Sequence, residues 1–124
     1  MSTNPEKAVS YVLSKYVTEY MNKDVLMLDM DTQTREAATM LRHYETDDII
    51  VLDKEKHPIG IVTDHDILSK VSDVTVFAES TVLKEIMTTP LITINEKATL
   101  QDALQKMRDN NVRKLPVISK KNQV

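Results

Sequence analysis

An internal repeat is the feature that most restricts how this chain of 124 residues can fold. A shift of 66 residues superposes residues 17–58 on residues 83–124 without a gap, and six of the 42 aligned pairs are identical. The apolar pattern agrees more widely; for example, VLML (25–28) aligns with LITI (91–94). This agreement predicts two copies of one supersecondary unit, which would bury their small sheets against each other in one pseudo-symmetric domain.

Hydrophobic periodicity predicts the elements of the first copy. Short apolar runs of strand length occur at residues 25–28, 49–52 and 59–62, and helical spacing occurs at TREAATMLRHY (34–44) and DHDILSK (64–70). The longer of these helices is expected to bury Ala37, Ala38, Leu41 and Tyr44.

The N-terminal segment 4–21 predicts one amphipathic helix. Asn4 is a natural N-cap, and Pro5 fits the first helical position because its missing N–H would have no partner there. The apolar stripe of this helix comprises Val9, Val12, Leu13, Tyr16, Val17 and Tyr20.

The repeat divides the chain into four parts: an N-terminal helix (1–14), a first repeat (15–71), a linker (72–81) and a second repeat (82–124). The second copy is incomplete, because it stops at Val124, which aligns with Pro58, and nothing corresponds to IGIVTDHDILSK. Two interpretations stay open: a chain cut at this point, or a repeat that never had the tail.

Composition excludes several classes of function. No apolar run approaches the roughly 18 residues of a membrane span, and the N-terminus lacks a signal peptide, so we expect a cytoplasmic protein without a membrane partner. The absence of cysteine excludes disulfides and Cys-based zinc sites. A net charge of −3, with one Phe and no Trp, argues against a nucleic-acid surface.

Catalytic and metal sites are not expected. Asp64, His65 and Asp66 are adjacent on a predicted helix and therefore point in different directions, which does not suit one metal ion. No Ser/His/Asp or Cys/His nucleophilic set stands out. We therefore predict a protein that is not an enzyme and has no catalytic cofactor.

Three segments resemble parts of the cystathionine β-synthase (CBS) domain family. MRDNNVRKLPVI (107–118) is similar to the family's helix end, polar pair and Leu-Pro-Val run, and KEIMTTPLITI (84–94) resembles its opening segment. GIVTDHD (60–66) matches the closing pattern of Gly, two apolar residues, Thr, and Asp three further on. The departures are the missing end of the second copy and Ile50, which stands where the family has proline.

The order of these segments, over roughly residues 12–124, resembles a tandem CBS pair, or Bateman module. This resemblance implies an α/β (α+β) fold. Each repeat would be a small three-stranded sheet with helices, and the two would pack with pseudo-twofold symmetry.

Thr63 and Asp66 allow two interpretations. The structural one is a capping box, in which each side chain accepts a hydrogen bond from the backbone N–H of the other residue. The functional one follows from the resemblance: Thr63 would bind a phosphate at the helix N-terminus, and Asp66 would accept from the ribose hydroxyls. The two are compatible if Thr63 caps the empty form. Gly60, the chain's one glycine, would let a strand or a ligand approach closely.

Arg113 and Lys114 also allow two interpretations. They can be a solvated pair at a helix end, where cations suit the dipole. In CBS pairs, basic side chains at these positions reach phosphates held by the other repeat, so the resemblance implies phosphate recognition. Asp47 and Asp48 occupy the equivalent positions of the first copy. This reversal of sign, with the missing second closing pattern, predicts one nucleotide site per chain.

The resemblance implies a regulatory module that binds an adenine nucleotide, AMP, ADP or ATP, in the cleft between its repeats. Asp47 would accept from the exocyclic amine, whereas simple core packing is the competing role for Met27. The expected nucleotide-binding residues are Asn22, Met27, Thr46, Asp47, Ile61, Thr63, Asp66, Arg113 and Lys114.

CBS modules commonly pair through their helices, so the apolar stripes at residues 9–20 and 64–71 predict a homodimer. The resemblance also implies a regulated protein partner. The alternative is a module without a small ligand, which would serve only dimerisation or protein–protein interaction, or would regulate an attached enzyme or transporter. In that case GIVTDHD is a capped turn, and Arg113 and Lys114 are solvated.

Overall fold

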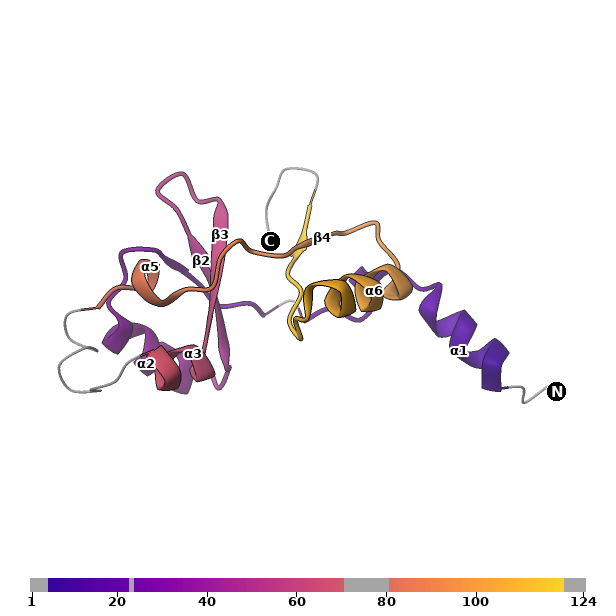
Figure 1. Ribbon diagram of the computed structural model, residues 1–124, viewed down its shortest axis with the longest axis horizontal. Coiled ribbons are helices and arrows are strands. Elements are labelled where there is room, and N and C mark those ends of the chain that lie inside the picture. Colours follow the sequence, from indigo (N-terminus) through magenta and orange to yellow (C-terminus); the bar gives the residue numbers. More distant parts are fainter. Residues whose placement is uncertain (1–4, 23, 71–80, 120–124) are drawn as a thin grey trace. The chain divides into compact units, whose positions relative to one another are not determined.

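The computed structural model describes residues 5–22, 24–70 and 81–119 (Figure 1). The chain forms two compact units, which we call the first-repeat unit (residues 23–91) and the second-repeat unit (residues 1–22 with 92–124). No helix in the described ranges is long and apolar enough to cross a membrane. The expected N-cap Asn4 lies outside these ranges, and so does the expected linker at 72–81 except for its last residue.

The first-repeat unit contains a three-stranded sheet in the order β1–β2–β3. Strand β1 (Met27–Asp29) runs parallel to β2 (Asp48–Leu52), which pairs antiparallel with β3 (Pro58–Thr63). Helices α2 (Thr34–His43) and α3 (Asp64–Lys70) lie side by side (Figure 1). With the short helix α5 (Leu83–Ile86) they enclose a core of Ala37, Leu41, Ile49, Val51, Val62, Leu83 and Ile86.

The second-repeat unit contains two parallel strands, β4 (Ile94–Asn95) and β5 (Val117–Ile118). Helix α6 (Leu100–Asn110) connects them, and the chain enters this unit through α1 (Pro5–Leu13) and the 3-10 turn η1 (Val17–Glu19). Its buried core residues are Val17, Ile94 and Ala103.

The strand register confirms the 66-residue repeat. Leu28 pairs with Val51 in the first sheet, and Ile94 pairs with Val117 in the second. Adding 66 to the two residue numbers of the first pair gives the residue numbers of the second pair. The repeat therefore preserves backbone pairing, although few of its aligned residues are identical.

Each repeat begins with a short helical turn, which we call its opening turn: η1 in the first repeat and α5 in the second. Each opening turn packs into the unit that carries the strands of the other repeat. The N–H of Val17 donates to the carbonyl oxygen of Ala98, and the N–H of Leu83 donates to that of Thr32, both at 2.9 Å. These two bonds are again related by the 66-residue shift. Val17 and Leu83 are 4% and 0% exposed, so each opening turn supplies a core residue. The compact units therefore differ from the sequence repeats.

The prediction of one continuous helix over 4–21 is wrong. The helix begins at Pro5 as expected but ends at Leu13, and Tyr16 is extended (φ −73°, ψ 146°). The backbone leaves the helix because the carbonyl of Lys15 accepts from the N–H of Leu100 at 2.9 Å. Of the expected apolar stripe, Val17 is buried, whereas the large side chains Val9, Val12, Tyr16 and Tyr20 are exposed.

The expected buried face of α2 is partly wrong. Ala37 and Leu41 are buried, but Ala38 and Tyr44 are exposed. Ala38 is rotated away from the core by one helical step, and Tyr44 follows the last residue of α2, where the chain turns. The expected helix at 64–70 is confirmed, and the three expected strands of the first copy are found with ends shifted by one or two residues.

Candidate functional site

Strand β3 passes directly into α3, and a capping box fixes the turn. Thr63 is the last residue of β3, and Asp66 is the third residue of α3. The N–H of Asp66 donates to Thr63 Oγ1 at 3.1 Å, and the N–H of Thr63 donates to Asp66 Oδ2 at 2.9 Å. The predicted capping box is therefore confirmed.

The Asp66 carboxylate also holds the opening segment of the second repeat. Its Oδ1 lies 3.3 Å from Lys70 Nζ and accepts from the Thr88 hydroxyl at 3.4 Å. Lys70 Nζ in turn donates to the carbonyl oxygen of Ile86 at 2.9 Å. Asp66 is only 8% exposed, and a carboxylate so far removed from water needs such partners. We call Asp66, Lys70 and Thr88 the carboxylate cluster.

Gly60 lies where the same segment passes β3. A Cβ at this position would be 2.7 Å from Met87 Sδ and 3.1 Å from the carbonyl oxygen of Thr88. Ile61 and Thr88 exchange two backbone hydrogen bonds of 2.8 and 3.2 Å at this point. The close approach that the glycine permits is therefore that of another part of the chain.

The sheet brings several expected site residues near one another. Met27 and Ile61 occupy one row across the sheet, with a single residue of β2 between them. The N–H of Asp64 donates to the carbonyl oxygen of Asp47 at 3.0 Å, which holds the start of β2 beside Thr63. Six expected positions, from Met27 to Asp66, thus belong to one compact unit.

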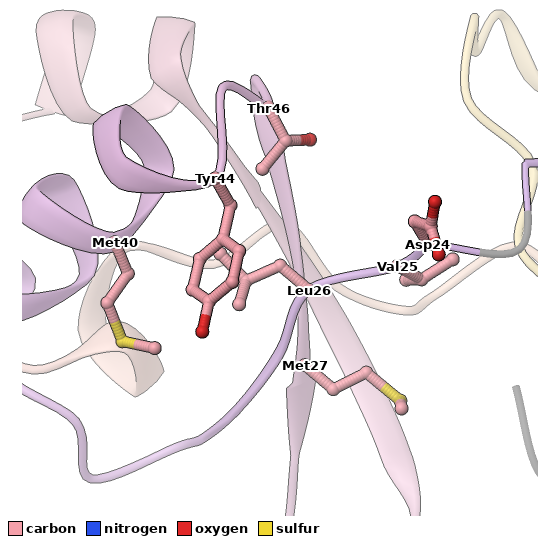
Figure 2. Close-up of a pocket in the computed structure, with 7 residues that line it drawn as sticks. All are labelled: Asp24, Val25, Leu26, Met27, Met40, Tyr44 and Thr46. Atoms are coloured by element: carbon pink, nitrogen blue, oxygen red, sulfur yellow. The ribbon is translucent and has the colours of Figure 1, made fainter.

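A hollow of about 700 Å³ opens between the start of β1 and the end of α2 (Figure 2). Figure 2 shows the Tyr44 ring between Met40 and Leu26, with Thr46 and Asp24 toward the other end. Its volume lies in the range of about 300–1,000 Å³ that is usual for small-molecule sites. The lining residues are Asp24, Val25, Leu26, Met27, Met40, Tyr44 and Thr46.

The end of α2 directs Tyr44 and Thr46 to this hollow. Glu45 has a left-handed backbone (φ 51°), and the N–H of Thr46 donates to the carbonyl oxygen of Leu41 at 3.1 Å. This is the six-residue bond of a Schellman motif, which ends a helix by reversing the chain direction. The motif recurs at the end of α6, where Asn111 has φ 53°.

Two of the nine expected site residues line this hollow, and the others lie elsewhere. Met27 and Thr46 line the hollow, whereas Ile61, Thr63 and Asp66 lie on β3 and α3. Asp47 directly precedes β2, and Asn22, Arg113 and Lys114 belong to the second-repeat unit, where they are exposed. Their part in a site stays a prediction. Within the described ranges, no three His, Cys, Asp or Glu side chains gather to hold a metal ion.

Sequence reasoning missed most of the apolar lining of the hollow. Helical spacing predicts Tyr44 in the core, but Tyr44 is the C-cap residue of α2 and directly precedes the left-handed Glu45 of the Schellman turn. Met40 was not recognised, because a methionine on an amphipathic helix is more often a core residue. Leu26 carries no signal that distinguishes it from a buried strand residue.

Comparison with known proteins identifies the class of protein that this fold represents. The CBS domain family model matches residues 17–73 and 83–124. The chain therefore belongs to the CBS domain family and contains two copies of the domain. The predicted resemblance is confirmed, as is the mixed α/β fold of the CBS pair.

Particular relatives show how far the likeness extends. An uncharacterized protein from Methanopyrus kandleri is 26% identical over 102 residues, which cover 82% of this chain and 52% of the relative. The chain spans from about a quarter to about half of the length of the first three curated relatives.

Two solved structures share the fold. A CBS domain protein from Pyrobaculum aerophilum complexed with AMP is 23% identical with a TM-score of 0.75, over 88% of this chain and 82% of that one. A CBS domain pair in complex with 5′-methylthioadenosine and S-adenosyl-L-methionine is 23% identical with a TM-score of 0.76, over 89% of this chain and 85% of that one.

Proposed function

We propose that this chain is a regulatory, non-catalytic module that binds an adenine nucleotide, AMP, ADP or ATP. The observation that carries the proposal is the turn from β3 into α3, where Thr63 and Asp66 stand in the same unit as a ligand-sized hollow. The AMP complex of the Pyrobaculum aerophilum protein supports this class of ligand.

The hydrogen bonds at the turn leave room for a ligand. Thr63 Oγ1 accepts from the N–H of Asp66 and can donate its own hydrogen to a phosphate oxygen, because a hydroxyl is both donor and acceptor. The hydroxyl of Thr88 reaches Asp66 over 3.4 Å, which is long for a bond between two oxygens. A ribose hydroxyl can therefore replace this donor at small cost while the bond to the N–H of Thr63 is kept.

Arg113 and Lys114 would supply the positive charge that phosphates require. An arginine can bind a phosphate through two parallel hydrogen bonds, and a lysine acts as a point charge. In the same proposal Asp47 accepts from the exocyclic amine, and Asn22 and Ile61 complete the walls.

Regulation requires that the ligand favours one state of the module or its partner, since a ligand shifts an equilibrium only by its differential affinity. We propose a homodimer that contacts a regulated protein. The apolar side chains Val9 and Tyr11 of α1 and Leu68 of α3, which are 56%, 64% and 76% exposed, are available for such contacts.

Thermal unfolding with and without millimolar AMP, ADP, ATP or S-adenosylmethionine tests the proposal. A ligand at a hundred times its dissociation constant should raise the free energy of unfolding by about 2.7 kcal/mol. An unfolding temperature that no ligand in this set changes would contradict it.

Replacement of Asp66 by alanine should abolish the ligand-induced shift and lower the stability of the free protein by about 0.5–2 kcal/mol through the lost cap. Asp102→Ala is the matched control. Asp102 forms the same capping box with Thr99 at the start of α6, with bonds of 3.0 and 3.2 Å. This variant should lose less stability, because Asp102 is exposed whereas Asp66 is buried and also holds Lys70 and Thr88, and it should keep the shift. A full shift in Asp66→Ala would show that the carboxylate does not hold the ribose.

Arg113→Ala should weaken ATP binding more than adenosine binding, because adenosine lacks phosphates. Calorimetric titration with both ligands measures the difference. An equal loss for the two would contradict the phosphate role of Arg113.

The alternative is a module that mediates only assembly. Two observations favour it: the Asp66 carboxylate already has three partners, and the apolar side chains of α1 are exposed. Sedimentation equilibrium of Val9→Glu and Leu68→Glu separates the alternatives. A protein that dimerises through these faces, and that no adenine nucleotide stabilises, would match the alternative.

A further inference from the structure

The hollow of the first-repeat unit has an aromatic wall that the second repeat does not reproduce. Tyr44 and Met40 line it, and the 66-residue shift places Asn110 and Lys106 at their positions. The two repeats share strand register and helix-ending motif at this place. The two repeats therefore differ at this place in their side chains and not in their backbone conformation.

Tyr44 is positioned by the backbone and yet remains accessible. The Schellman turn at Glu45 fixes its Cα, and its ring meets the His43 ring edge-on, with centroids 4.9 Å apart and an interplanar angle of 88°. The residue is nevertheless 59% exposed. Leu26 and Met40 line the same hollow as the ring (Figure 2). An aromatic ring held in this way loses little conformational freedom when a flat ligand covers it.

The second repeat offers no such wall. The side-chain amide of Asn110 donates to the carbonyl oxygen of Lys106 at 2.9 Å, so it is bonded to its own helix. Asn110 and Lys106 are both exposed. Neither side chain has an aromatic face against which a base could stack.

We propose that Tyr44 stacks against the base of the bound nucleotide and is the residue that selects a ligand with a planar ring, in the first repeat only. This inference rests on the proposed function. It assigns recognition of the base to Tyr44, and it holds for AMP, ADP and ATP alike because all three carry the same base. Leu26 and the thioether of Met40 complete the apolar surround, which suits an aromatic ring. Stacking of a base on an aromatic side chain contributes about 1–3 kcal/mol, which corresponds to a factor of about 5–150 in affinity.

Calorimetric titration of the full chain with AMP and with adenosine tests the inference. Tyr44→Ala should weaken both ligands by the same factor, about 5–150-fold, because both carry the base. Tyr44→Phe should bind like the wild type, since it keeps the ring. Asn110→Ala, which changes the equivalent position of the second repeat, serves as the control and should bind normally.

The outcomes separate the inference from the function on which it rests. Unchanged AMP affinity in Tyr44→Ala, with an unfolding temperature near that of the wild type, overturns the stacking role and leaves nucleotide binding intact. A loss for AMP but not for adenosine also overturns it. A wild-type chain that binds neither ligand removes the proposed function and the stacking role together.

Discussion

Replacement of Gly60 by alanine should destabilise the first-repeat unit by about 1–2 kcal/mol. The new Cβ would lie 2.7 Å from Met87 Sδ, 3.1 Å from Met87 Cγ and 3.1 Å from the carbonyl oxygen of Thr88. The methionine side chain can turn away. The carbonyl of Thr88 cannot move freely, because it accepts from the N–H of Ile61 at 3.2 Å, already near the long limit of a hydrogen bond.

The magnitude follows from two opposing effects. Extra atoms in a packed site cost about 1–3 kcal/mol, because neighbours and backbone must shift. Against this, an alanine has fewer conformations than glycine in the unfolded chain, which favours folding by about 0.5–1 kcal/mol. The packing cost exceeds the gain because one of the three close contacts is with backbone.

Urea unfolding of Gly60→Ala, Met87→Ala and the double variant measures this effect. If the side chain of Met87 carries part of the cost, the double variant should be more stable than the sum of the single effects by about 0.5–3 kcal/mol. Additive effects would show that Met87 is not the obstacle. A Gly60→Ala protein as stable as the wild type would refute the packing argument itself.

Two further substitutions test the local geometry by the same unfolding measurement. Glu45→Gly should raise stability by about 1 kcal/mol, because Glu45 has φ 51° and glycine adopts this region without strain. Asn111→Gly should gain less, since asparagine tolerates the left-handed region, and equal gains would contradict this reason. Lys70→Met should cost about 1–2 kcal/mol, because it removes the bond to the carbonyl of Ile86 and leaves Asp66 short of a partner, while the 40% exposure of the Lys70 side chain limits the loss. No loss of stability in Lys70→Met would show that the carboxylate cluster does not hold the opening segment.

The repeat, its 66-residue period and the turn from β3 into α3 could be predicted from the sequence. These features depend on local rules: strand-length apolar runs, helical spacing, and a threonine and an aspartate three residues apart. The same rules hold in any surroundings, so the expected helix at residues 64–70 and the bonds between Thr63 and Asp66 are found as predicted.

The break after α1 and the exchange of opening turns could not be predicted in this way. The sequence of residues 4–21 satisfies helical spacing throughout, yet the backbone at Lys15 and Val17 bonds instead to Leu100 and Ala98. Bonds to residues so far along the chain outweigh local propensity, and a periodicity argument contains no information about them.

The sequence by itself thus determined that the chain is a tandem repeat of one α/β unit and that Thr63 and Asp66 can cap a helix. Only the tertiary structure decided which unit each opening turn completes, what Gly60 faces, and that Tyr44 lines a hollow instead of the core. The physical reason is that a cap or a strand depends on neighbours within a few residues. A buried contact depends on whichever distant segment fills the space, as Met87 and Thr88 do beside Gly60.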